Sequence, residues 1–134
     1  MERLKIRITE TSQALKSLFK ALMIKKPSEL ERDGAIQRFE FTFESLWKTA
    51  QFYLKEFESV EANSPKSCIR SLGENGILTE KETINALAMA DDRNLTSHTY
   101  IETIAVRIYK RLHPHAFLMN EILSRIRGKI GLKS

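Results

Sequence analysis

Residues 36–57 read IQRFEFTFESLWKTAQFYLKEF, and their apolar pattern sets the class of fold. Phe39, Phe41 and Phe43 alternate as they would in a β-strand, but apolar positions continue at helical spacing through the whole stretch. These positions are Ile36, Phe39, Phe43, Leu46, Trp47, Ala50, Leu54 and Phe57. Because strands rarely exceed about ten residues, the length of this pattern predicts a helix.

The predicted helix has a second apolar side. Phe41 and Phe52 are eleven residues apart. At 100° per residue they lie almost in line, about 200° from the stripe that begins at Phe39. A helix that is apolar on two faces is either central in a bundle or carries a subunit interface. Both alternatives require several packed helices.

Helical signals occur on both sides of this stretch. Apolar residues recur at steps of three, four or seven over residues 4–22, before Lys25-Lys26-Pro27 ends the pattern. Ser64-Pro65 is an N-cap followed by proline at the first helical position, and residues 79–82, TEKE, form a capping box.

Three further amphipathic segments follow the capping box. They cover residues 84–92, 101–112 and 117–130, separated by break signals near Asn94 and by a stop or kink at Pro114. We therefore predict an all-α, up-and-down bundle of four to five helices that forms a single domain over residues 1–134.

Composition excludes several classes of protein. The chain has 134 residues and a single cysteine, so no internal disulfide forms. Its longest apolar run, Ala86–Ala90, is too short to cross a membrane. We expect a soluble cytoplasmic protein that has no membrane contact.

Charge is distributed unevenly along the chain. The net charge is +5 over residues 1–26, −6 over residues 27–106 and +6 over residues 107–134. If the two basic ends pack side by side, they form a face suited to a phosphate backbone or an acidic protein. Otherwise these charges are ordinary solvated helix surface.

Familiar enzyme motifs are missing from the sequence. It contains no Gly-rich phosphate loop, no His-Glu-x-x-His pair, no Gly-x-Ser-x-Gly elbow and no Cys-x-x-Cys pair. His113-Pro114-His115 has no adjacent third ligand, and we interpret these histidines as solvated surface. We predict neither a metal nor a cofactor.

The segment DDRNLTSHTY, residues 91–100, concentrates polar and titratable groups between two amphipathic helices. In an unbroken helix Arg93 and His98 diverge by about 140° and are ~7.5 Å apart along the axis. Break signals at residues 94–97 would let both side chains converge on one phosphate. Tyr100 shares the side of His98 if the backbone is extended there.

Arginine and histidine together suffice for metal-free cleavage of RNA. Arginine neutralises the charge that grows on the phosphorus, and histidine moves a proton near neutral pH. The second proton carrier is not identified by the sequence. The alternative is structural, with Arg93 paired to Asp91 or Asp92 and His98 serving as a helix-end residue.

Three blocks of sequence resemble the nucleotidyltransferase substrate-binding proteins, a branch of the HEPN superfamily. They are residues 38–48 (RFEFTFESLWK), 64–70 (SPKSCIR) and 92–100 (DRNLTSHTY). The last block fits the Arg-x4-His-x-Tyr form of HepT-like toxins in HEPN/MNT toxin–antitoxin pairs. The fold that this resemblance implies is a helical bundle similar to the C-terminal domain of kanamycin nucleotidyltransferase.

The resemblance implies two alternative functions. In the first, Arg93 and His98 are the catalytic residues of a metal-independent endoribonuclease, acting in a homodimer and silenced when a minimal nucleotidyltransferase transfers AMP to Tyr100. Asn94 and Asp92 would then support the active site. In the second, the chain is a noncatalytic substrate-binding subunit that completes the active site of the same partner. Both alternatives require the nucleotidyltransferase, and only the first requires RNA.

Overall fold

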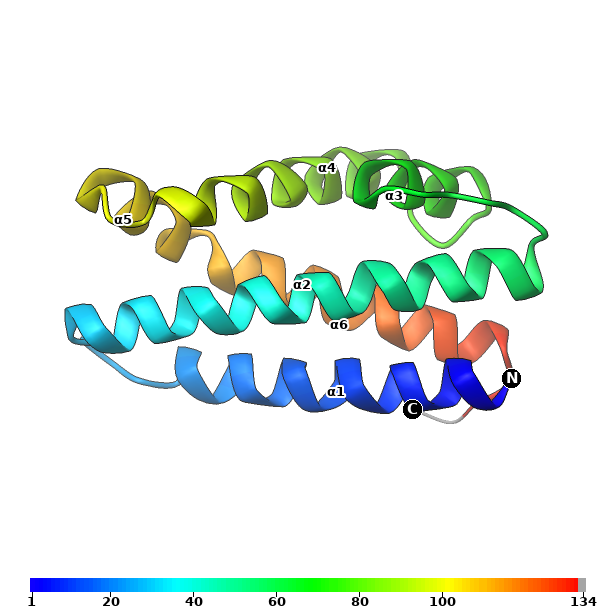
Figure 1. Ribbon diagram of the computed structural model, residues 1–134, viewed down its shortest axis with the longest axis horizontal. Coiled ribbons are helices and arrows are strands. Elements are labelled where there is room, and N and C mark those ends of the chain that lie inside the picture. Colours follow the sequence, from blue (N-terminus) through cyan, green and yellow to red (C-terminus); the bar gives the residue numbers. More distant parts are fainter. Residues whose placement is uncertain (133–134) are drawn as a thin grey trace.

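The protein is an elongated helical bundle (Figure 1). The structure, a computed structural model, describes residues 1–132. Its elements are α1 (Glu2–Leu22), α2 (Glu29–Phe57), α3 (Pro65–Glu74), α4 (Glu80–Leu95), the 3-10 helix η1 (Thr96–His98), α5 (Glu102–Lys110) and α6 (Leu112–Lys129). Residues 1–132 contain no β-strand, which confirms the predicted all-α bundle.

α2 is the central helix, since it packs against each of the other five α-helices. Its predicted stripe is buried, and Phe39 and Leu54 have no exposed surface. The second side is only partly covered. Phe41 is 45% exposed, whereas the Phe52 ring has the guanidinium carbon of Arg7 4.6 Å from its centroid. α2 therefore occupies a central position, which is one of the two alternatives that its two apolar sides left open.

Capping boxes begin three of the helices. Those at Ser64 and Thr79 begin α3 and α4 as predicted, each with a reciprocal pair of side-chain and backbone hydrogen bonds. A third box joins Ser28 and Glu31, so α2 begins seven residues before Ile36, where the apolar stripe starts. This start lies outside the apolar stripe, because the first apolar residue of α2, Leu30, is 83% exposed and does not face the core.

The predicted interruption near Pro114 is present, but it precedes the proline. α5 ends at Lys110 and α6 begins at Leu112, which places Pro114 in the first turn of α6. A proline ring clashes with the carbonyl four residues earlier, here that of Lys110, and its missing N–H costs nothing in a first turn. The helix therefore restarts before the proline instead of kinking at it.

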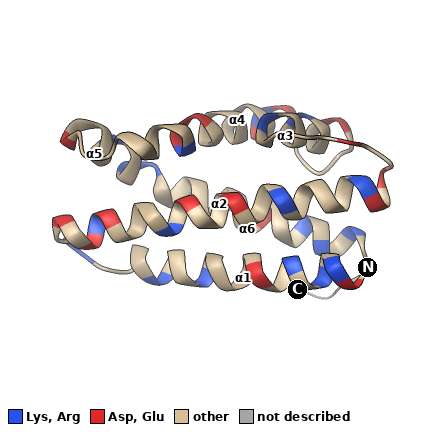
Figure 2. Cartoon of the chain, in the orientation of Figure 1, with Lys and Arg blue, Asp and Glu red and all other residues tan. Residues whose placement is uncertain are grey.

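The start of the first basic segment and the end of the second lie at the same end of the bundle (Figure 2). α1 packs against α6, and Figure 2 shows Lys and Arg gathered near the start of α1 and the end of α6. The sequence left open whether the two basic ends pack side by side, and the contact between α1 and α6 shows that they do. No helix within residues 1–132 has the length and apolar character needed to span a membrane.

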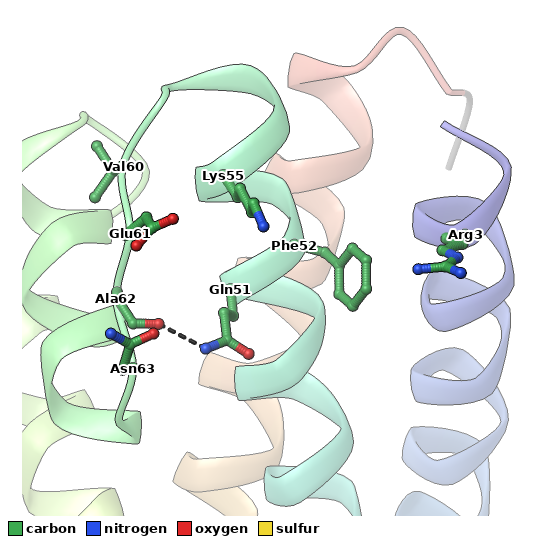
Figure 3. A pocket seen from close by; sticks show the side chains of 8 residues that line it. All are labelled: Arg3, Gln51, Phe52, Lys55, Val60, Glu61, Ala62 and Asn63. Carbon is green, nitrogen blue, oxygen red and sulfur yellow. Dashed lines mark hydrogen bonds between the residues drawn. The ribbon is translucent and has the colours of Figure 1, made fainter.

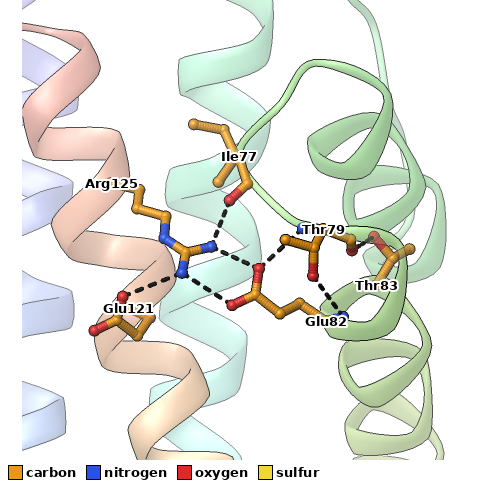
Figure 4. Close-up of polar contacts among 6 residues, drawn as sticks. All are labelled: Ile77, Thr79, Glu82, Thr83, Glu121 and Arg125. Carbon is orange, nitrogen blue, oxygen red and sulfur yellow. Dashed lines mark hydrogen bonds and ion pairs between the residues drawn. The ribbon is translucent and has the colours of Figure 1, made fainter.

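Arg125 connects α6 to the beginning of α4 (Figure 4). It donates to the carbonyl oxygen of Ile77 at 2.8 Å and to both carboxylate oxygens of Glu82 at 2.7 and 2.9 Å. Glu82 also accepts from the Thr79 backbone N–H at 2.9 Å. Hydrogen bonding to Arg125, followed by the bond from Thr79, lowers the pKa of Glu82 from 4.5 to about 2.

This lowered pKa predicts a specific loss of stability in acid. Glu82 contributes stability above pH 4.5, its unfolded-state pKa, and the contribution is lost as pH falls toward 2. We expect Glu82→Gln to lower the free energy of unfolding by about 2 kcal/mol at pH 7. The difference from the parent protein should shrink at pH 3.

Urea unfolding at pH 7 and pH 3 measures this effect. Glu80→Gln is the matched control, because Glu80 lies in the same first turn of α4 and is exposed. An equal deficit of Glu82→Gln at both pH values would contradict the assigned role of the carboxylate.

Candidate functional site

The segment that contains the motif remains helical further than predicted. α4 ends at Leu95, so the predicted break in the α-helix between Arg93 and His98 is present, but the chain continues as the 3-10 helix η1 and the next α-helix begins only at Glu102. The hydroxyls of Thr96 and Ser97 donate to the carbonyls of Arg93 and Asn94, at 2.6 and 3.1 Å. These bonds occupy carbonyls that a helix end leaves free, so the chain tightens into a 3-10 turn.

Arg93 projects from the last turn of α4 toward α2. Its guanidinium lies 3.4 Å from the Glu40 carboxylate and 3.2 Å from that of Glu44, and it donates to the Thr96 hydroxyl at 3.0 Å. Its Nε is buried and has no well-aligned acceptor. The Arg93 side chain is 25% exposed, which leaves part of the guanidinium open to solvent.

The predicted pairing of Arg93 with the neighbouring aspartates is wrong. Asp91 contacts Lys66 of α3 at 2.6 Å, and Asp92 points into the bundle. Successive helical residues diverge by 100°, so three consecutive side chains reach three different elements. Glu40 and Glu44 were not predicted as partners of Arg93, although their spacing of four places them on one face of α2.

His98 and Tyr100 are brought together on the surface. Both are exposed, Tyr100 to 80%, and their ring centroids are 6.1 Å apart at an interplanar angle of 66°. The backbone between them is not extended, because Thr99 has φ −72° and ψ −7°. A turn produces the proximity that was predicted for a strand-like conformation. Arg93 is directed instead toward α2.

Asp92 belongs to a buried polar cluster. It is 5% exposed, accepts a 2.7 Å hydrogen bond from Nε2 of His115 and lies 3.2 Å from Nε of Arg111. His115 stacks on Phe39, with ring centroids 5.4 Å apart. Burial lowers the pKa of His115, against the opposing effect of Asp92.

Of the two histidines that flank Pro114, only one lies on the solvated surface. His113 is exposed, but His115 is 7% exposed, so the surface interpretation of His115 is wrong. Its partner Asp92 is twenty-three residues away in the sequence, and no local pattern signals that pairing. Asp92 therefore fixes the end of α4 to α6 inside the bundle.

Asn94 and Arg93 line a surface pocket of about 320 Å³ with Glu44 and Lys66. Asn94 is exposed, and its carbonyl is held by Ser97. Residues 1–132 contain no group of three metal-ligating side chains that could hold an ion. The side chains that line the pocket offer a ligand a guanidinium, an ammonium and an amide, beside the carboxylate of Glu44.

The contrast between the two aspartates gives a stability prediction. We expect Asp92→Ala to lower the free energy of unfolding by about 3 kcal/mol, since it leaves His115 and Arg111 without their acceptor in a buried site. Asp91→Ala should cost less than about 1 kcal/mol, because the Asp91–Lys66 pair is exposed. Urea unfolding of both variants tests the distinction, and equal losses would contradict it.

Solved structures define the class of fold to which the chain belongs. A protein from Thermus thermophilus is 48% identical, with a TM-score of 0.85 over 87% of this chain and 98% of that chain. A tri-AMPylated Shewanella oneidensis HEPN toxin, solved in complex with its MNT antitoxin, is 16% identical with a TM-score of 0.75 over 93% and 96%.

A Haemophilus influenzae protein described as the substrate binding domain of a nucleotidyltransferase is 23% identical, with a TM-score of 0.61 over 94% of this chain and 98% of that chain. No curated protein sequence matches the chain. The model of the family described as nucleotidyltransferase substrate binding protein like matches residues 6–127. The chain belongs to this family.

Proposed function

We propose that the chain is the HEPN-type partner subunit of a minimal nucleotidyltransferase and acts as the toxin of a toxin–antitoxin pair. It cleaves RNA without a metal ion and is silenced by transfer of AMP to Tyr100. One observation carries this proposal. The 80% exposed Tyr100 ring lies 6.1 Å from the exposed His98 ring, so that a group added to the tyrosine stands beside the histidine.

The family and the fold of the chain support a minimal nucleotidyltransferase as its partner. A nucleotidyltransferase active site must reach the acceptor hydroxyl, and the exposure of Tyr100 permits this approach. The phenolic oxygen would attack the α-phosphorus of ATP, pyrophosphate would leave, and the phenolic proton would pass to a base or water at the partner's site. The resulting phosphodiester adds negative charge and bulk beside His98.

RNA cleavage would follow internal transesterification. The ribose 2′-oxygen attacks the adjacent phosphorus and loses its proton, while the bond to the 5′-oxygen breaks and that oxygen gains a proton. The products are a 2′,3′-cyclic phosphate and a 5′-hydroxyl. His98 moves one of the two protons, and Arg93 stabilises the charge that grows on the phosphoryl oxygens.

For this reaction, Arg93 must exchange its contacts with the carboxylates of Glu40 and Glu44 for contacts with an RNA phosphate. Glu40 and Glu44 are 34% and 37% exposed, so both ion pairs are open to solvent and to competition. A phosphate approaching the exposed edge of the guanidinium replaces one acceptor by another of the same charge. A homodimer that brings two motifs into one cleft would supply a second His98 as the other proton carrier.

A second function is favoured by the same ion pairs. Two carboxylates already neutralise Arg93 in the isolated chain, as expected of a residue that shapes a binding surface. In this alternative the chain is a noncatalytic subunit that completes the substrate site of the nucleotidyltransferase. It would then raise the transfer rate of its partner and leave RNA intact.

Cleavage of a mixed RNA pool in EDTA tests the first function. The purified protein, with an unmodified Tyr100, should produce cyclic phosphate ends, and His98→Ala should cleave at least about a hundredfold more slowly. Arg93→Ala should also lose cleavage while retaining its helix content by circular dichroism. His113→Ala is the matched control, because His113 is an exposed histidine outside the motif.

Full cleavage by both motif variants would show that Arg93 and His98 are not catalytic. If the unmodified parent protein produces no cleavage, the ribonuclease proposal fails and the substrate-binding subunit becomes the better account.

A further inference from the structure

A second surface, away from the motif, combines an aromatic ring with positive charges. Phe52 of α2 lines a pocket of about 310 Å³ together with Arg3 of α1 and Lys55 of α2. In Figure 3 the Phe52 ring projects into the space between the two helices, and Arg3 faces it from α1. A second hollow of about 310 Å³ shares Phe52 and Arg3 and adds Arg7 and the acidic Glu10.

Phe52 packs at the edge of the hydrophobic core, and part of its ring remains open to solvent. The ring is only partly buried on the outer side of α2, and the Arg7 guanidinium carbon lies 4.6 Å from its centroid. Lys48 and Lys55, both exposed, stand four residues before and three residues after Phe52, so they occupy the same helix face. Cations therefore surround the ring from both helices.

We propose that this surface binds the part of a single-stranded RNA that extends away from the proposed cleavage site, with a base stacked on the Phe52 ring and phosphates near Arg3, Arg7 and Lys55. Aromatic rings that accept bases and cations that follow the backbone are the two components of single-strand binding sites. A duplex keeps its bases stacked inside and presents none to the ring.

Other groups in the pocket suit the edge of a base. Glu61 and Asn63 form a wall of the pocket on the segment between α2 and α3, and they offer a carboxylate acceptor and an amide. Gln51 donates to the carbonyl of Ala62 at 2.7 Å, which holds this wall against α2. The pocket is thus partly preformed.

The segment that joins α2 to α3 contributes to this pocket and to the pocket beside Arg93. The wall of the Phe52 pocket ends at Asn63, and the next residue, Ser64, lines the pocket that contains Arg93 and Asn94. A strand that occupies both pockets would place its scissile phosphate near Arg93 and the base of a more distant nucleotide on Phe52, because Phe52 lies about 12 Å beyond Glu44 along the axis of α2. This inference rests on the proposed RNA-directed function, and it predicts contacts that are separate from the chemistry.

Binding of a fluorescein-labelled, mixed-sequence single-stranded RNA tests the proposal by fluorescence anisotropy. The full-length His98→Ala protein is used so that the probe is not cleaved. Phe52→Ala should weaken binding roughly tenfold, the usual effect of losing one stacked base. Phe52→Trp, which keeps an aromatic face, should retain binding and shows that the loss is not one of folding.

Salt dependence separates charge from stacking. Lys55→Ala should reduce the slope of log K against log salt concentration by about 0.7, the value for one phosphate contact on a single strand. Phe41→Ala and Lys81→Ala are the matched controls, since both residues are exposed and lie outside the two pockets. Neither should change affinity or slope.

The outcomes distinguish this site from the proposed function. If Phe52→Ala binds RNA as tightly as the control while cleavage still depends on His98, the Phe52 site is refuted and the ribonuclease stands. If no variant, including the parent, binds or cleaves RNA, both are refuted. If Phe52→Ala binds RNA normally but no longer assembles with the nucleotidyltransferase, the surface is a protein interface and the RNA site is overturned.

Discussion

The contact between Phe39 and His115 is the point on which the arrangement of the bundle depends. Phe39 belongs to the central helix α2 and has no exposed surface, and His115 of α6 stacks on it. The same imidazole binds Asp92 at the end of α4. Three helices are therefore fixed relative to one another at one buried site, directly beside the motif.

This buried cluster explains how the motif is oriented. Asp92 faces inward and anchors α4, so the next residue, Arg93, must face α2, where Glu40 and Glu44 receive it. His98 and Tyr100 follow in a tight turn and reach solvent. A buried ionic group costs desolvation energy but restricts the alternatives for helix rotation. Here the restriction determines which side chains the motif presents on the surface.

The helices could be predicted because their signals are local. Apolar spacing identified α2, and serine and threonine caps identified the starts of α3 and α4. Pairings between helices have no such signal, because they depend on how each helix is rotated. Arg93 meets Glu40 and Glu44 about fifty residues away, and His115 meets Asp92 across the core. α4 extends beyond its predicted end near Asp92, because the hydroxyls of Thr96 and Ser97 bind the preceding carbonyls and continue the helical turn.

The central claim is that Tyr100 and His98 form one functional site, in which modification of the tyrosine stops the chemistry at the histidine. The most direct measurement follows RNA cleavage in one protein sample while the partner nucleotidyltransferase and ATP convert Tyr100, with the modified fraction determined by mass spectrometry. We predict that cleavage falls in proportion to the AMP-bearing fraction, and that Tyr100→Phe protein stays active throughout, with Tyr109→Phe behaving as the parent. Full cleavage by completely modified protein would contradict the account.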